Sequence, residues 1–437
     1  MRTSGSRASS GRALPLLDHT LSRRNLLGGL GLGAVAALAA CGSSDTPTAG
    51  GKTPLKVYGW KGGGSEPANI AQVNAAFQQA NPDIELTFEY VPPNDPYTQR
   101  VQPELLAGKS ADVIMTDSSK VQDWGSAGYL EDLGSGSWTA NVLPALKPFI
   151  SQNSTIYAVP MEIIGIDLYA NTDLLAKAGV SAVPTTFPAF LAALGAAKKA
   201  GITPLGMPNK NGWTGAAALN AIAATKVYQA TPDWDTKFLA GQASFADWQS
   251  SVDQLLQLQT AGFVDYRKEL GVDEWTQGLA DFTSGKSAFW FQGAWNLSAV
   301  EKAGVKSVFV PWPGADEGAQ PSANLFVGTM WSIHAESKVK DAAKKYVEFW
   351  ASSTNAAPYL TAENAVSPFQ GGTTPSSDAT ADFVKSFSAN RYRILPSNTW
   401  SGAEGEKTMQ QQVQALMLGQ TSAADMLKGF DKSLRKS

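Results

Sequence analysis

The chain has 437 residues, of which 43% are hydrophobic and 17% charged, a composition typical of globular proteins. Its formal net charge of −3 provides no basic field for nucleic acid, so we expect no nucleic-acid partner. The single cysteine, Cys41, and the two histidines, His19 and His334, are too few for zinc sites built from these residues or for a Cys–His protease. A serine hydrolase would depend on His334, and no G-x-S-x-G motif supplies its nucleophile. We expect no metal and no cofactor.

The N-terminal segment has the organisation of an export signal. Paired arginines, Arg23 and Arg24, precede an apolar segment, 26–38, that is too short to span a hydrocarbon core of about 30 Å. The pattern Ser-Arg-Arg-x-Leu-Leu resembles a twin-arginine signal, and Leu-Ala-Ala-Cys resembles a bacterial lipobox, whose cysteine is acylated and becomes the first mature residue. The alternative interpretation of this segment is a buried glycine-rich helix, but it does not explain the lone cysteine, Cys41. We predict that residues 1–40 are a signal peptide, and the sequence does not distinguish the twin-arginine route from the general secretory route.

Residues 41–53 are predicted to be a lipidated tether, rich in Gly, Ser and Thr. A diacylglyceryl thioether on Cys41 supplies two acyl chains, and stable anchoring requires more than one. No second apolar segment approaches the roughly 18 residues that a membrane span needs. We therefore expect a protein held by lipid on the extracellular or periplasmic face of the cell membrane.

Strands and helices alternate after the tether. Residues 55–60 predict a strand that opens into a glycine-rich loop, 61–67, and then a helix. Residues 84–90 alternate as a half-buried strand, and residues 112–115 form a continuous apolar strand of the parallel type. This order predicts a parallel sheet, whose ligands bind beyond the carboxyl ends of the strands. The candidate ligand-binding residues at those ends are Trp60, Lys61, Glu66, Asp117 and Ser118.

Several motifs occur in a fixed order along the chain. They are Leu-Lys-Val-Tyr-Gly-Trp at 55–60, Phe-Gln-Gln-Ala-Asn-Pro-Asp-Ile at 77–84, Ala-Asp-Val-Ile-Met at 111–115, Gly-Tyr-Leu-Glu-Asp-Leu at 128–133 and Phe-Thr-Ser-Gly-Lys-Ser-Ala-Phe-Trp-Phe-Gln-Gly-Ala-Trp-Asn at 282–296. In this order they resemble the extracellular solute-binding proteins of bacterial ABC importers, of the sugar-binding type that includes the maltodextrin-binding protein. The resemblance covers essentially all of the predicted mature chain.

The resemblance implies a two-lobed α/β fold of the periplasmic-binding-protein type II. Each lobe would be a mostly parallel sheet flanked by helices, with the ligand cleft between the lobes. We expect lobe 1 to comprise residues 54–164 and 311–352, and lobe 2 to comprise residues 165–310 and 353–437. The chain would then cross between the lobes near 162–165, 310–314 and 350–355.

Glu162 lies at the first expected crossing. A carboxylate there either accepts hydrogen bonds from vicinal sugar hydroxyls or is a solvated hinge residue. Both interpretations agree with the sequence, so Glu162 is kept as a candidate ligand-binding residue.

Tryptophans in predicted loops are further candidates. The turn at 293–296 exposes Trp295 beside the N–H groups of a helix start, and an aromatic face next to hydrogen-bond donors suits a sugar ring. The loop 209–213 exposes a second tryptophan among glycine and amides, and the resemblance adds two more at cleft positions of the family. For each of them the alternative is a place in the hydrophobic core. These candidates are Trp213, Trp295, Asn296, Trp331 and Trp400.

The resemblance also implies a function. We expect a monomeric, non-enzymatic lipoprotein that captures a mono- or oligosaccharide by interlobe closure and delivers this carbohydrate ligand to the transmembrane subunits of an ABC permease. The alternative is the same scaffold binding a polyol, a glycerophosphodiester or a polyamine. A remote alternative is a secreted glycosidase, for which two of Glu66, Asp117 and Glu162 would have to form a pair roughly 5 to 10 Å apart.

Overall fold

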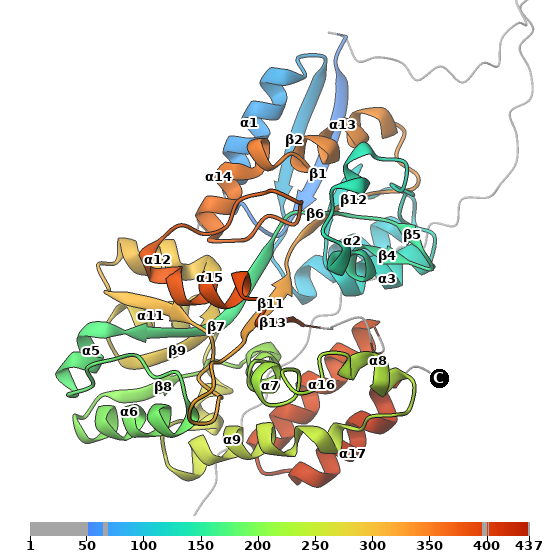
Figure 1. Cartoon of the computed structure of the whole chain (residues 1–437). Helices are drawn as coiled ribbons and strands as arrows, with labels where there is room; N and C mark the ends of the chain where they lie inside the picture. The colour runs from blue at the N-terminus through green and yellow to red at the C-terminus, as the bar shows by residue number, and fades with distance from the viewer. Residues whose placement is uncertain (1–50, 64–68, 396–399, 401, 436–437) are drawn as a thin grey trace, which may run out of the picture. The chain divides into compact units, whose positions relative to one another are not determined.

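The computed structural model describes residues 51–63, 69–395, 400 and 402–435. The predicted signal peptide, Cys41 and Glu66 lie outside the described residues. Two sheets organise the described part of the chain, each flanked by helices (Figure 1). This arrangement confirms the predicted mixed α/β fold class.

The first sheet has five strands in the order β2-β1-β3-β12-β6. Its strands are β1 (Thr53–Gly59), β2 (Ile84–Tyr90), β3 (Val113–Thr116), β6 (Val159–Pro160) and β12 (Met330–Ile333). The three strands predicted from the sequence form its parallel part, because β1 pairs in parallel with both β2 and β3. The helices of this part of the chain are α1 (Ile70–Ala80), α2 (Asp95–Leu106), α3 (Ser118–Ser126), α4 (Lys147–Ile150), α13 (Lys340–Trp350) and α14 (Ser353–Glu363).

The second sheet has the order β13-β11-β7-β9-β8, and β10 pairs with β7. Its strands are β7 (Ile163–Asn171), β8 (Thr203–Gly206), β9 (Ser287–Gly293), β10 (Ser307–Val310), β11 (Ala323–Val327) and β13 (Tyr392–Ile394). Every residue of the central strand β7 is buried. A separate hairpin pairs β4 (Ser151–Gln152) with β5 (Thr155–Ile156).

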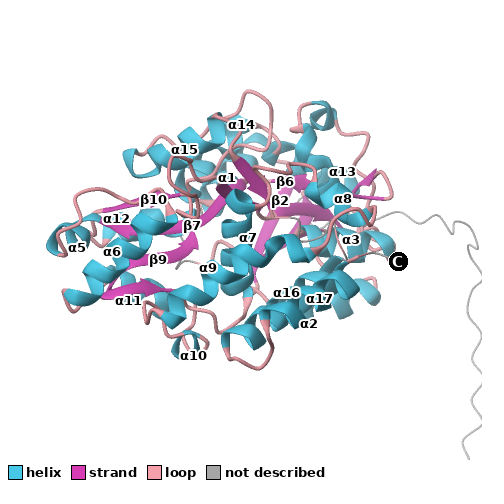
Figure 2. Ribbon diagram, turned by 60° about the horizontal axis from the view of Figure 1, so that its bottom comes forward, coloured by secondary structure: helices cyan, strands magenta, loops and turns pink. Residues whose placement is uncertain are grey.

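Helices cover the second sheet on both faces. Figure 2 shows α7, α9, α16 and α17 gathered together, and each of these helices contacts two of the others. The helices are α5 (Thr172–Lys177), α6 (Phe187–Lys199), α7 (Trp213–Lys226), α8 (Trp234–Leu239), α9 (Gln249–Thr260), α10 (Tyr266–Glu269), α11 (Gln277–Thr283), α12 (Leu297–Lys302), α15 (Ala381–Ser388), α16 (Gly402–Met417) and α17 (Ala423–Leu434). Helix α7 is rich in alanine and is buried from Thr214 to Thr225. Its small side chains let the helix lie close to the sheet.

The chain passes between the sheets at two paired segments, and once more after α14, between Glu363 and β13. It leaves β6 at Pro160 and enters β7 at Ile163, and it returns between Val327 and Met330. The two segments are hydrogen-bonded to each other, from Met161 N to the Thr329 carbonyl at 3.0 Å and from Gly328 N to the Glu162 carbonyl at 3.1 Å. Two connections lying side by side form a hinge between the sheets.

Two of the expected crossings are corrected by the structure. Both β10 and β11 belong to the second sheet, so residues 311–327 stay with it and the chain returns at 327–330 rather than at 310–314. Helix α14 packs against α1 and α13, so residues 353–363 stay with the first sheet. The sequence pattern identifies strands and breaks, but it does not say to which sheet a strand hydrogen-bonds.

Gly165 in β7 is required by packing. A Cβ atom at this position would lie 2.5 Å from the ring of Phe383 and 2.7 Å from the ring of Phe309. We predict that Gly165→Ala lowers the free energy of unfolding by about 1–3 kcal/mol through overpacking. Denaturant unfolding measures this change.

Gly195→Ala in α6 is the matched control, because the nearest atom to a Cβ there lies 3.9 Å away. This control is expected to raise stability by up to about 1 kcal/mol through helix propensity. Equal effects of the two substitutions would contradict the packing argument.

Candidate functional site

The carboxyl ends of the strands in both sheets lie beside the two crossing segments. In the second sheet, β9 ends at Gly293, which pairs with Ile166 near the start of β7. In the first sheet, β3 ends at Thr116, which pairs with Met330 just after the return crossing. The loops that follow these strands are where ligands of open α/β sheets bind.

Two tryptophans from the loops after β8 and β9 and one from the loop between α10 and α11 form one cluster, named here the tryptophan cluster. It consists of Trp213, Trp275 and Trp295. Trp213 and Trp275 are stacked with ring centroids 5.6 Å apart, and Trp295 lies 6.0 Å and 5.8 Å from them. Trp213 is the first residue of α7, Trp275 precedes α11, and Trp295 lies in the single turn Ala294–Asn296 after β9.

The tryptophan cluster keeps part of its surface accessible. Nine of the 13 tryptophans of the chain are buried, and only Trp60 and the three members of the cluster are partly exposed. The indole N–H groups of the cluster have no hydrogen-bond acceptor in the described structure, and the neighbouring Asn296 is buried with its Nδ2 also unpartnered. The cluster therefore presents partly exposed aromatic faces, while these donor atoms are themselves buried.

Gly293 is required beneath Trp295. A Cβ atom at this position would lie 2.2 Å from the Trp295 ring, so the ring lies directly over the glycine. We predict that Gly293→Ala displaces Trp295, lowers the free energy of unfolding by about 1–3 kcal/mol, and increases quenching of tryptophan emission by acrylamide.

Gly206→Ala, at the end of the neighbouring strand β8, is the control for that substitution. The nearest atom to its Cβ is a hydroxyl oxygen at 3.3 Å. Unchanged quenching in Gly293→Ala would show that Trp295 does not depend on the close approach.

The first sheet contributes a second group of side chains. Trp60 is partly exposed, lies edge-on to Tyr97 at 4.8 Å, and has the Lys120 ammonium 5.4 Å from its ring. Asp117 is the N-cap of α3 and accepts a hydrogen bond from Lys120 N at 2.8 Å. It also forms an ion pair with Lys120 Nζ at 2.5 Å. Ser118 is buried. Much of the hydrogen-bonding capacity of the Asp117 carboxylate is thus used within its own helix turn.

Helix α16 connects this group with the tryptophan cluster. Ser119 Oγ donates to Glu406 Oε2 at 2.8 Å, and Gln410 Nε2 donates to Glu406 Oε1 at 3.3 Å. One turn further, Gln414 Nε2 donates to the carbonyl of Asn209 in the loop before Trp213, at 3.3 Å. Desolvation, with the nearby Asp117 charge, raises the pKa of Glu406. The polar face of α16 therefore runs from α3 to the tryptophan cluster.

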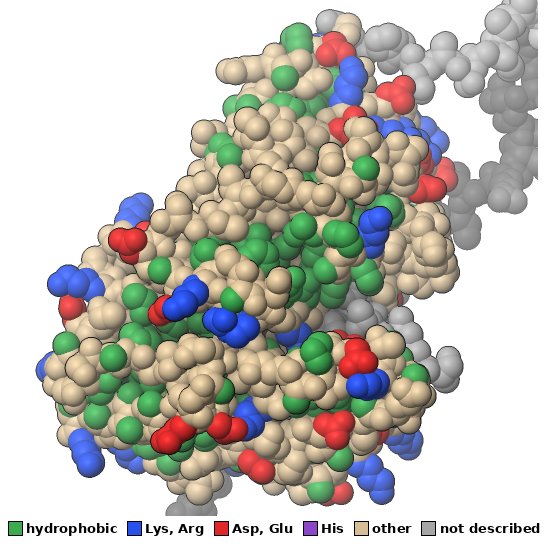
Figure 3. Space-filling view, viewed as in Figure 1, with side chains coloured by type: hydrophobic (Ala, Val, Ile, Leu, Met, Phe, Trp, Pro, Cys, Tyr) green, Lys and Arg blue, Asp and Glu red, His purple; other side chains and the backbone are tan. Residues whose placement is uncertain are grey.

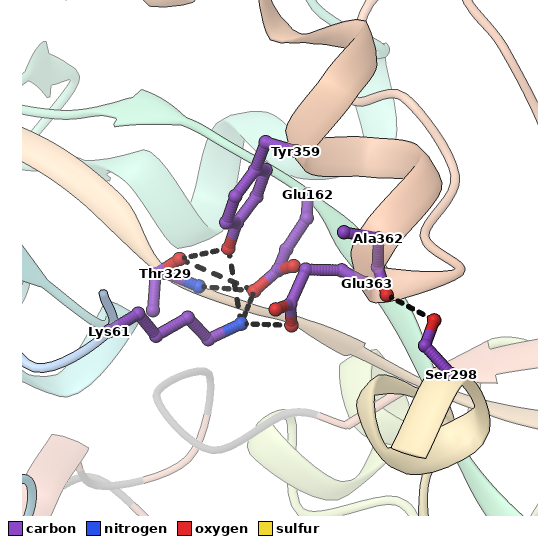
Figure 4. A network of polar contacts seen from close by, with 7 residues as sticks. All are labelled: Lys61, Glu162, Ser298, Thr329, Tyr359, Ala362 and Glu363. Carbon is purple, nitrogen blue, oxygen red and sulfur yellow. Dashed lines mark hydrogen bonds and ion pairs between the residues drawn. The ribbon is translucent and has the colours of Figure 1, made fainter. Parts of the chain in front are cut away.

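Lys61 and Glu162 meet in a lysine cluster at the crossing segments (Figure 4). Lys61 Nζ lies 2.7 Å from Glu162 Oε1, 2.6 Å from Glu363 Oε2 and 3.1 Å from the Tyr359 hydroxyl. Glu162 Oε1 also accepts from Thr329 N at 3.2 Å, and its Oε2 is buried with no partner in the described structure. Burial lowers the pKa of Lys61, but the charges of Glu162 and Glu363 outweigh it, and the pKa lies well above its usual range.

Removing the Lys61 ammonium would leave two carboxylates buried together. We predict that Lys61→Ala lowers the free energy of unfolding by about 3–5 kcal/mol, the usual cost of breaking a buried pair. Lys306→Ala is the control, because its ion pair with Asp173 is exposed and long, at 3.6 Å. The control is expected to cost at most about 1 kcal/mol. Chemical denaturation compares the two variants, and similar costs would contradict this role of Lys61.

A model of the family described as bacterial extracellular solute-binding protein matches residues 63–357. This match covers more than half of the chain, in the order of strands and loops given above. The chain belongs to this family. The solute-binding protein is also 25% identical, over 323 residues, to a mannitol-binding protein of Pseudomonas aeruginosa, an alignment that spans 66% of this chain and 70% of that protein.

Solved structures share the fold of this solute-binding protein. A chitin oligosaccharide binding protein matches with a TM-score of 0.72 and 20% identity over 88% of this chain and 98% of that one. A sugar transporter protein from Bacillus licheniformis, solved in complex with stachyose, matches with a TM-score of 0.68 and 15% identity over 88% of this chain and 99% of that one. The two sheets described above are therefore the two lobes of a solute-binding protein.

Two tryptophans expected in the cleft of the solute-binding protein are core residues instead. Trp331 is fully buried against Tyr346 and Trp350. Trp400 is also buried among four aromatic rings, and its Nε1 donates to Asp235 at 3.1 Å. The sequence of a strand or a turn does not reveal which way a tryptophan ring in it points. We therefore leave Trp331 and Trp400 out of the proposed site.

Two residues of the candidate site were not found from the sequence. Trp275 follows Asp273, whose Oδ1 accepts from the backbone N–H groups of Trp275 and Thr276 at 3.1 and 2.9 Å. A tryptophan in a turn just before a helix is the sequence pattern that could have identified Trp275, as it identified Trp295. Glu406 had no comparable signal, because its role depends on α16 packing against α3.

An apolar cavity of about 510 Å³ lies apart from both clusters. Its lining includes Leu143 and Leu146 from the first lobe and Leu325, Tyr392 and Ile394 from the second. Figure 3 shows hydrophobic side chains gathered on this face, over β11 and β13. A mostly apolar lining has few partners for hydroxyl groups, so this cavity is not the candidate site for a polar solute.

The described residues include no group of three His, Cys, Asp or Glu side chains that could hold a metal ion. Among these same residues, no helix is both long and apolar enough to cross a membrane.

Proposed function

We propose that this solute-binding protein captures a carbohydrate outside the cell and delivers it to the transmembrane subunits of an ABC permease. The observation that carries the proposal is the tryptophan cluster, whose neighbouring rings are partly exposed. The C–H faces of a sugar ring pack on aromatic rings, while its hydroxyls accept and donate hydrogen bonds. The similarity to a chitin oligosaccharide binding protein and to a sugar transporter protein solved with stachyose supports a carbohydrate ligand.

A polyol is the second candidate, because the matched relative from Pseudomonas aeruginosa is a mannitol-binding protein. A linear polyol has no ring face to stack on three indoles, and for this reason the carbohydrate is preferred. Anionic solutes such as glycerophosphodiesters are not favoured, because Lys61 and Lys120 are already paired with carboxylates. A glycosidase is not favoured either, since Glu162 is paired with Lys61, and Asp117 with Lys120.

Capture needs no covalent chemistry. A ligand that contacts both lobes binds the closed arrangement more tightly and shifts the population toward it. The paired crossing segments around Glu162 and Gly328 provide the hinge for this motion. We include Trp60, Asp117, Ser118 and Ser119 on the first lobe and the tryptophan cluster, Asn296 and Glu406 on the second in the ligand site.

Export and anchoring complete the proposal. Residues 1–40 are the signal peptide, and lipid on Cys41 holds the mature protein, as a monomer, at the outer face of the cell membrane. These features are proposed from the sequence, because they lie outside the described residues.

A thermal-shift screen of residues 42–437 with mono- and oligosaccharides, hexitols and polyamines tests the ligand class. A ligand at 100 times its Kd adds about 2.7 kcal/mol to stability, which raises the melting temperature by about 3 °C for a chain of this size. We expect a carbohydrate to give this shift, and Trp213→Ala and Trp295→Ala to abolish it.

Phe263→Ala is the control for loss of a partly buried aromatic ring outside the site. It is expected to lower the melting temperature while keeping the ligand-induced shift. A shift with hexitols and none with sugars would replace the carbohydrate by a polyol, and a shift with polyamines alone would overturn the ligand class.

A further inference from the structure

The three rings of the tryptophan cluster come from loops far apart in the sequence, so their mutual orientation needs a common support. We infer that Glu274 is a positioning residue that holds these three loops in register. The part of this inference that concerns ligand affinity rests on the proposed function. The part that concerns the orientation of the three rings applies to the ligand-free protein. Glu274 itself is fully buried and does not reach the site surface.

The carboxylate of Glu274 holds the loop that carries Trp213. Its Oε1 accepts from Asn211 N at 2.7 Å, and its Oε2 accepts from Asn211 Nδ2 at 2.6 Å. Both carboxylate oxygens are therefore used on one residue, two positions before Trp213. A two-point contact fixes both the place and the orientation of the loop.

The backbone of Glu274 holds the loop that carries Trp295. Its carbonyl accepts from Gln292 Nε2 at 3.0 Å, and Gln292 Oε1 accepts from Gly293 N at 2.9 Å. Gln292 is fully buried, and Gly293 is the residue over which the Trp295 ring lies. The third ring, Trp275, follows Glu274 directly in the chain. One residue thus connects all three rings.

The fold of these loops does not depend on the Glu274 side chain alone. Glu269 Oε2 accepts from Met207 N at 2.9 Å, and the Glu269 carbonyl accepts from Asn209 N at 2.9 Å. Lys210 N donates to the Val272 carbonyl at 3.2 Å. These bonds keep the two loops together when the Glu274 carboxylate is changed, so a variant is expected to fold with the rings reoriented.

Burial of the Glu274 carboxylate is unfavourable in free energy. Burial raises the pKa of Glu274, and the bonds from Asn211 oppose this shift. No ion pair to Glu274 is present among the described residues. Keeping a carboxylate buried without a cation costs stability, which agrees with a role in setting the geometry of the site.

The test uses a side-chain exchange. Glu274→Met keeps the length of the side chain and removes both acceptors of Asn211, so both hydrogen bonds are lost. The double variant Glu274→Gln with Asn211→Asp keeps both bonds, with the polarity of the side-chain bond reversed, because the new aspartate accepts from the new amide and the backbone N–H of residue 211 still donates to the amide oxygen. Asp431→Asn is the control, since Asp431 holds Phe245 N at 2.8 Å and Ser244 Oγ at 2.6 Å, remote from the tryptophan cluster in the chain.

The first measurement is near-ultraviolet circular dichroism of the ligand-free protein, which reports the mutual orientation of stacked indoles. Trp275→Phe identifies the band that belongs to the cluster. We expect this band to weaken in Glu274→Met, to be retained in the double variant, and to be unchanged in Asp431→Asn, while the far-ultraviolet spectrum stays the same in all of them. An unchanged band in Glu274→Met, or a loss that also occurs in the double variant, would overturn the inference.

The second measurement is calorimetric titration with the carbohydrate that gives the largest thermal shift. Glu274→Met is expected to weaken binding by at least about tenfold, the equivalent of one lost hydrogen bond, and the double variant is expected to keep the wild-type affinity. If the wild-type protein binds no carbohydrate, the proposed function fails and the dichroism result alone decides the role of Glu274. Wild-type affinity in Glu274→Met would contradict the role even if carbohydrate binding itself is confirmed.

Discussion

A buried ammonium between two carboxylates lies at the point where the chain passes between its lobes. Lys61 comes from the end of β1, Glu162 from the first crossing segment and Glu363 from the end of α14, so one cation joins three separate parts of the chain. The Glu162 carbonyl and Oε1 bind the return crossing at Gly328 and Thr329. Desolvation makes such clusters weak sources of stability, but their geometry is demanding. The cluster therefore fixes where the two crossing segments lie, and with them the hinge.

The same cluster is connected to the ligand side of the second lobe. The Ala362 carbonyl, next to Glu363, accepts from Ser298 Oγ at 3.0 Å, and Ser298 lies just after Trp295 and Asn296 (Figure 4). Asn364 Nδ2 also contacts Ser298 Oγ, at 3.4 Å. Hydrogen bonds of Ser298 therefore join the segment beside the lysine cluster to the helix that follows the Trp295 turn. Glu274 supports this turn as well, through Gln292 and Gly293.

Much of the fold follows from local sequence patterns. The strands around residues 55–60, 84–90 and 112–115 were predicted because hydrophobic periodicity and glycine-rich breaks are local properties. Trp213 and Trp295 were also predicted, because a tryptophan in a polar, glycine-containing turn has no partner within that turn. Trp331 and Trp400 were expected in the cleft from the resemblance, but they lie in the two hydrophobic cores. Burial is decided by residues distant in the sequence, such as Trp350 for Trp331 and Asp235 for Trp400.

The sequence by itself determined the class of fold, the family and the presence of tryptophans at strand ends, because periodicity, motif order and turn composition are written in neighbouring residues. Only the tertiary structure decided that Lys61 and Glu162 pair with each other, that β11 belongs to the second lobe, and that Trp275 joins Trp213 and Trp295. Each of these depends on contacts between segments tens to hundreds of residues apart, such as Lys61 with Glu363. Such contacts are selected by the packing of the whole fold, since many pairings satisfy the local pattern and only one satisfies all buried groups together.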